Sequence, residues 1–165
     1  MKSLIKIIRQ ALVLPADVSL EFHKTCQRGE QLDCRLTIKS RESPIDIAKI
    51  SITLMAEENV EVDAGYQSGY DSEADDVEVT IHVGTVTSED ITFKETIMVS
   101  NAIILEPNRE YSWKANFVVP KNCNATYHGV NAHHIWSLSA TITLANRKLL
   151  SKKNFSYTWD GPIVS

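Results

Sequence analysis

The sequence predicts an all-β protein, a two-sheet antiparallel β-sandwich of the immunoglobulin-like or arrestin-like kind, from three observations. Apolar residues recur at every second position in several short segments, which gives each segment one face for a core and one for water. Turn signals such as residues 28–30 and 43–44 separate these segments. No helical pattern of crossover length stands between them, so antiparallel pairing is expected.

The expected strands follow one another from Val18 to the C-terminus, eight to nine in all. Residues 64–76, 85–90 and 121–134 lack the alternation and are predicted to be loops, and the tryptophans are expected in the core. The residues that carry the alternation are Val18, Leu20 and Phe22; Leu32, Leu36 and Ile38; Ile50, Ile52 and Leu54; Val77, Val79, Ile81 and Val83; Ile91, Phe93 and Ile97; Tyr111, Trp113, Ala115 and Phe117; residues 135–144; and Phe155, Tyr157 and Trp159.

Residues 1–14 are predicted to be a short amphipathic helix ahead of a single sandwich domain at 15–165. Apolar residues of 4–12 fit helical spacing, Lys2, Lys6 and Arg9 lie largely between them, and Pro15 ends the helix. A strand is the competing prediction, because Ile-rich segments favour β-structure. Such a helix would dock on the sandwich, or contact an anionic membrane surface or a partner.

Composition is typical of a soluble domain, with 165 residues, 43% hydrophobic and 23% charged. No apolar run is long enough to span a membrane, and the N-terminus lacks the pattern of a secretory signal. Cys26, Cys34 and Cys123, an odd number without such a signal, indicate free thiols and a cytoplasmic location. Cys34 shares parity with Leu32 and Leu36 and is expected to be buried.

The net charge of −4 conceals a strongly acidic segment. Residues 50–93 contain eleven carboxylates and no Lys or Arg, so this segment carries −11 and the remainder +7. An acidic surface disfavours nucleic acid and attracts basic partners. The candidate partner-binding residues within 57–76 are Glu57, Glu58, Glu61, Asp63, Asp71, Glu73, Asp75 and Asp76.

Four segments, in order, resemble a known family. They are residues 28–38 (RGEQLDCRLTI), 45–54 (IDIAKISITL), 111–120 (YSWKANFVVP) and 135–138 (IWSL). These turn-and-strand patterns are similar to the N-terminal half of the arrestin fold, and most similar to the bacterial sporulation-control branch of that superfamily. The resemblance implies a non-enzymatic scaffold or adaptor that recruits other proteins.

Chemical signatures are weak by comparison. Cys123, His128 and His133, with His134, carry zinc-type ligands in one segment, but their spacing matches no zinc signature, so a plain polar loop is the main expectation. The carboxylates of 71–76 lack the glycine and distal glutamate of a calcium loop. No nucleophile elbow, phosphate-binding loop or zinc-protease helix is present, so we expect neither an enzyme nor a cofactor.

The sequence therefore predicts a cytoplasmic protein-interaction module. It would recruit a partner through an exposed edge strand or through the acidic 57–76 loop, and the same edges would permit a homodimer. Two alternatives stay open: a sandwich that binds carbohydrate or metal, and a self-assembling structural subunit. A second arrestin-type domain supplied by another chain is also left open.

Overall fold

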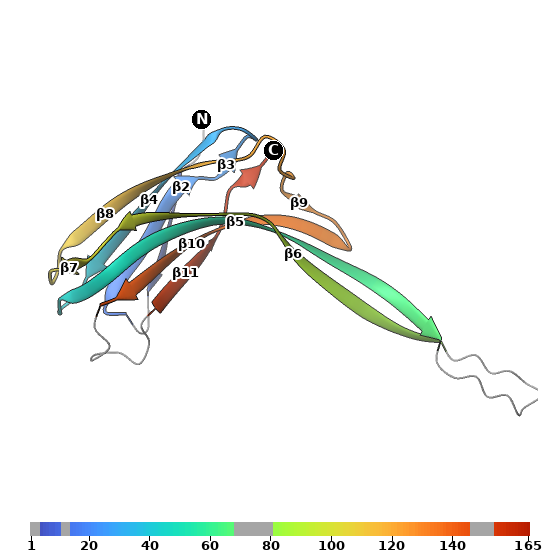
Figure 1. Ribbon diagram of the computed structural model, residues 1–165, viewed down its shortest axis with the longest axis horizontal. Helices are drawn as coiled ribbons and strands as arrows, with labels where there is room; N and C mark the ends of the chain where they lie inside the picture. Colours follow the sequence, from blue (N-terminus) through green and yellow to red (C-terminus); the bar gives the residue numbers. More distant parts are fainter. Residues whose placement is uncertain (1–3, 11–13, 68–80, 146–153) are drawn as a thin grey trace, which may run out of the picture.

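The computed structural model describes residues 4–10, 14–67, 81–145 and 154–165, and every regular element among them is a strand (Figure 1). The strands form two antiparallel sheets of a sandwich, which confirms the predicted all-β class. No helix in the described part of the chain is long and apolar enough to cross a membrane.

The first sheet has the order β1-β2-β4-β8. Its strands are β1 (Leu4–Gln10), β2 (Ala16–His23), β4 (Gln31–Ser40) and β8 (Glu110–Val118). The predicted turn before β4 is present, and Gly29 occupies it with a φ of 82°, a left-handed conformation that glycine adopts without steric cost.

The second sheet has the order β11-β10-β5-β6. Its strands are β5 (Ile45–Gln67), β6 (Ile81–Ser100), β10 (Ala132–Leu144) and β11 (Asn154–Asp160). Two short strands extend this sheet: β7 (Ile103–Leu105) pairs with β5, and β9 (Tyr127–His128) pairs with β10. A separate parallel pair joins β3 (Thr25–Cys26) to β12 (Ile163–Val164).

The core lies between the two sheets and is built from the residues that alternate in the sequence. Leu20 and Phe22 of β2 and Ile50, Ile52 and Leu54 of β5 are all fully buried. Each such side chain contributes about 1.5–3 kcal/mol through removal from water. Trp136 and Trp159 are buried as expected, while Trp113 is partly buried and packs against the edge of the core.

The predicted N-terminal helix is wrong. Residues Leu4–Gln10 form β1, which pairs antiparallel with β2 from Leu4 opposite His23 to Gln10 opposite Asp17. The segment is short and rich in isoleucine, and the free edge of β2 supplies hydrogen-bond partners that an isolated short helix lacks. The competing strand prediction therefore holds, and membrane contact through an amphipathic helix loses its structural basis.

Three predicted loops are also partly wrong, because strands run through them. β5 continues through residues 57–67, so the acidic segment begins as a strand rather than as a loop. Residues 85–90 lie within β6, and the end of the predicted 121–134 loop belongs to β9 and β10. Residues 68–80, which include the rest of the acidic loop and the start of one predicted strand, lie outside the described residues.

Candidate functional site: the β5–β6 arm

The most distinctive feature of the fold is a two-stranded arm that extends from one end of the sandwich (Figure 1). β10 pairs with β5 only as far as Ala132 opposite Val60, where the Glu61 N–H donates to the Asn131 carbonyl at 2.7 Å. Beyond this point β5 pairs with β6 alone, from Glu61 opposite Thr87 to Gln67 opposite Ile81. We call residues 61–67 and 81–87 the arm, and residues 57–60 and 88–91 its base.

The two faces of the arm differ in chemistry. The face that continues the core side of β5 carries Val62 opposite Val86, and these side chains are 53% and 57% exposed. The opposite face carries Glu61 and Asp63, and Thr85 Oγ1 donates to Asp63 Oδ1 at 3.2 Å. The arm is therefore an amphipathic ribbon, with an apolar face that the sandwich does not cover.

The arm and its base concentrate negative charge. The described carboxylates here are Glu57, Glu58, Glu61, Asp63, Glu89 and Asp90. Residues 50–93 contain no Lys or Arg, and no described cation forms an ion pair with any of these six carboxylates. Glu58 lies directly opposite Asp90 in the β5–β6 register, a like-charge cross-strand pair that destabilises a sheet.

A buried histidine anchors the base of the arm. His134 of β10 is fully buried; Thr92 Oγ1 lies 2.7 Å from its Nε2, and its Nδ1 lies 3.2 Å from the Ala125 carbonyl oxygen. Because a carbonyl only accepts, Nδ1–H is the donor there, while the Thr92 hydroxyl beside Nε2 also donates to the Ala56 carbonyl at 3.3 Å. Thr92 is the extra residue on β6 at the register shift beside Ala56, so the bulge itself is tied to β10.

Tyr127 of β9 completes this anchor. Its ring stacks on His134, with centroids 6.0 Å apart, and its hydroxyl donates to Glu58 Oε1. That hydrogen bond raises the pKa of Tyr127, with lesser contributions from desolvation and from the charge of Glu58. Three strands, β5, β9 and β10, thus meet through side chains at the point where the arm leaves the sandwich.

The structure brings together only part of the predicted acidic set. Glu57, Glu58, Glu61 and Asp63 lie in the base and the arm, whereas Asp71, Glu73, Asp75 and Asp76 lie outside the described residues. Sequence reasoning did not name Glu89 and Asp90 as site residues, although β6 places them beside the same base. The absence of Lys and Arg as far as residue 93 was the signal that could have found them.

The predicted metal ligands are only partly brought together. His128 and His133 face each other across the β9–β10 pair, with ring centroids 6.5 Å apart. Cys123 packs against the core instead, and burial raises the pKa of its thiol, partly offset by the charge of Arg28. Among the described residues no group of three or more His, Cys, Asp or Glu side chains is placed to hold a metal ion.

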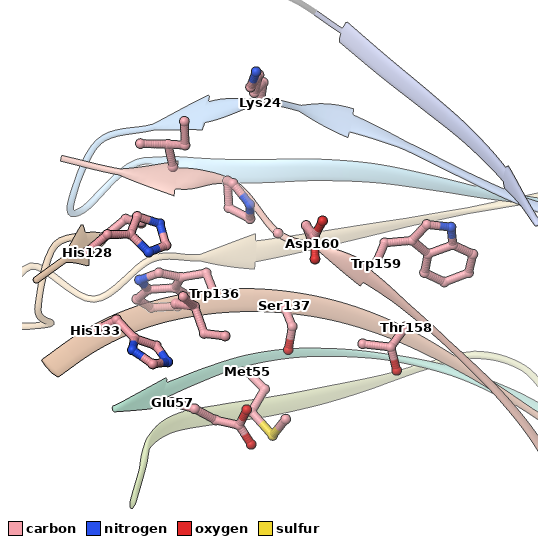
Figure 2. Close-up of a pocket in the computed structure, with 15 residues that line it drawn as sticks. Lys24, Met55, Glu57, His128, His133, Trp136, Ser137, Thr158, Trp159 and Asp160 are labelled. Carbon is pink, nitrogen blue, oxygen red and sulfur yellow. The ribbon is translucent and has the colours of Figure 1, made fainter. Parts of the chain in front are cut away.

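An open cavity of about 810 Å³ lies beside the arm base (Figure 2). Glu57 of the base lines it together with His128 of β9 and His133 of β10, and Lys24 after β2 and Asp160 at the end of β11 line it from the other side. Trp136 and Trp159 also line this cavity, but they are only 3% and 1% exposed and leave almost no ring face for a sugar to stack on. The cavity does not have the exposed aromatic platform that the carbohydrate alternative requires.

Comparison with known proteins identifies the fold. No protein-family model matches the chain, and no curated protein sequence matches it. Among solved structures it is similar to Spo0M, a sporulation control protein from Bacillus subtilis, with 12% identity and a TM-score of 0.52. The similarity covers 98% of this chain and 48% of that one, so the chain spans about half the length of that structure. The chain therefore has the arrestin-like fold that the sequence resemblance implied.

Proposed function

We propose that this protein is a non-enzymatic protein-interaction module that recruits a partner through the β5–β6 arm. The observation that carries the proposal is the arm itself, which extends past the end of β10 with an uncovered apolar pair and unbalanced negative charge. A two-stranded ribbon is marginally stable in water, and its unpaired edges can take up another chain. A partner would supply the missing cover and the missing positive charge.

The arrestin-like fold supports a role in interaction or regulation. The described cysteines are all free, with Cys26 and Cys34 buried, which fits a reducing compartment. We therefore propose a cytoplasmic location. Pairing of two arms in a homodimer would bring like charges together, so the proposal favours a partner of different sequence.

The proposal is tested by site-specific photo-crosslinking in a lysate of the source organism. A photoreactive residue replaces Val86 on the arm, and a matched control replaces Ile104 of β7, whose side chain is similarly exposed at 61%. We expect a discrete adduct from position 86 that position 104 does not give. The adduct should weaken when Glu61, Asp63 and Glu89 are changed to their amides. Equal adducts from both positions, or none from position 86, would overturn the proposal.

A further inference from the structure

We infer that the partner segment is an extended strand in which Lys or Arg alternates with apolar residues, and that it adds to the outer edge of β6 along the arm. This inference rests on the proposed function, because it names the chemistry of the partner for the same site. It commits to one edge and one kind of segment, and each choice follows from a separate observation.

The choice of edge follows from where β6 lacks features that hinder the addition of another strand. β6 is the outermost strand in the order of its sheet, so its outer edge runs free of β-pairing along the described strand. Near the sandwich this edge carries a bulge at Thr92 and a lysine at 94, two features that hinder addition of another strand. From Ile81 to Ile91 the register is unbroken, and this part contains no Lys or Pro. The arm section of β6 is thus the longer of the two sections left open to pairing, because the other edge of β5 is free only beyond Glu61.

The alternation of the partner follows from the two faces of the arm. Side chains of an added strand point alternately to the two faces, with a period of two. On one face they would lie beside Thr85, Thr87 and Glu89 of β6, with Glu61 and Asp63 one strand further away on β5. On the other they would lie beside Val86, with Val62 one strand further away and Asp90 at the base. Basic residues complement the first face, and apolar residues cover the second. One extended segment with both kinds of residue in alternation satisfies the two faces at once.

A second copy of this chain fits the same edge poorly. Antiparallel pairing of β6 with β6 centred between residues 89 and 90 would set Glu89 of one copy opposite Asp90 of the other. Like charges across strands destabilise pairing, and residues 50–93 offer no Lys or Arg to offset them. Negative charge on the edge strand therefore acts against self-association and in favour of a basic segment.

The test uses synthetic nine-residue peptides and the isotope-labelled full-length chain. The probe alternates lysine and valine and has capped ends. One control replaces every lysine with glutamate, and a second carries N-methyl groups on alternate residues, which removes the hydrogen-bond donors of one edge. Binding is followed by amide chemical shifts, and strand addition by amide hydrogen exchange. We expect shifts centred on residues 84–90 and slower exchange at alternate amides there, with neither control peptide binding.

Two matched variants separate the effect of the carboxylates on the arm from the effect of the net charge of the chain. The arm variant combines Glu61→Gln, Asp63→Asn and Glu89→Gln, and the control variant combines Glu42→Gln, Asp46→Asn and Glu110→Gln, all exposed and away from the arm. The arm variant should bind the lysine–valine peptide about tenfold more weakly, because each exposed ion pair contributes only a small energy. The control variant should bind within about twofold of the original chain. Amide shift dispersion shows whether each variant is folded.

Several outcomes would overturn the inference. These are equal binding of the N-methylated or glutamate peptide, shifts centred away from β6, an equal loss in both variants, or no binding of the lysine–valine peptide. Concentration-dependent shifts along β6 without peptide would instead indicate a second copy. A discrete crosslink from position 86 without binding of the lysine–valine peptide would still support the interaction role. It would refute only the inference that the partner segment is a strand of alternating basic and apolar residues.

Discussion

Alkaline pH should destabilise this protein through one buried thiol. Cys34 lies on β4 with 3% of its surface exposed, and its Sγ–H donates to the Ala115 carbonyl at 3.3 Å. Burial raises the pKa of this thiol from 9.0 to about 12, with a further contribution from the charge of Asp33. The unfolded chain ionises at the lower value, so the stability contribution is complete below pH 9 and is lost as the pH rises toward 12.

The magnitude follows from the difference between the two pKa values. Three pKa units correspond to about 4 kcal/mol when the loss is complete, and about half of this, roughly 2 kcal/mol, is lost by pH 10.5. The measurement is urea unfolding of the original chain and of Cys34→Ala at pH 7.5 and 10.5. Tyrosine and lysine groups titrate in both proteins, so their effects largely cancel in the comparison. The reasoning is refuted if both proteins lose the same stability between the two pH values.

Three further substitutions test the arm base and its surroundings. Gly161→Ala would place a Cβ 2.6 Å from the Trp136 carbonyl oxygen and should lower the free energy of unfolding by about 2 kcal/mol, so an unchanged urea midpoint would contradict it. His134→Ala removes a buried, doubly hydrogen-bonded ring and should cost about 3 kcal/mol and speed amide exchange at the arm base. Unaltered exchange there would rule out the anchoring role. Asp90→Asn relieves repulsion with Glu58 and should raise stability by about 0.5 kcal/mol at low salt, whereas a decrease would mean that the carboxylate is stabilising.

The sandwich was predictable because burial imposes a period on the sequence. Val18, Leu20 and Phe22 alternate because one face of β2 meets the core, and their burial confirms the pattern. Gly29 in the predicted turn before β4 has a φ of 82°, so the sequence also predicted the position of this turn. Where a strand has one wet face and one dry face, its sequence carries enough information to locate it.

The arm, apart from the strand predicted at Ile81 and Val83, and the N-terminal strand were mispredicted for different physical reasons. The arm has no opposing sheet, so an apolar face was not required, and only Val60 and Val62 on β5 hint at a period of two. The N-terminal segment has several apolar residues in sequence, and a short run of this kind fits helical and strand periods equally well. The free edge of β2, which decides the outcome, is a tertiary feature that local sequence does not record.

The arm is the part of this protein whose construction folding alone does not explain. Burial accounts for the sandwich strands, whereas beyond Val60 the β5–β6 pair exposes Val62 and Val86 and adds uncompensated carboxylates to a ribbon of marginal stability. Side chains that work against local stability are concentrated at functional sites in folded proteins. If stability alone shaped this region, a shorter hairpin ending beside β10 would serve better. A partner that is basic on one face and apolar on the other would balance the carboxylates and cover the exposed valines. Substitutions that neutralise the carboxylates should therefore stabilise the free chain and weaken the complex.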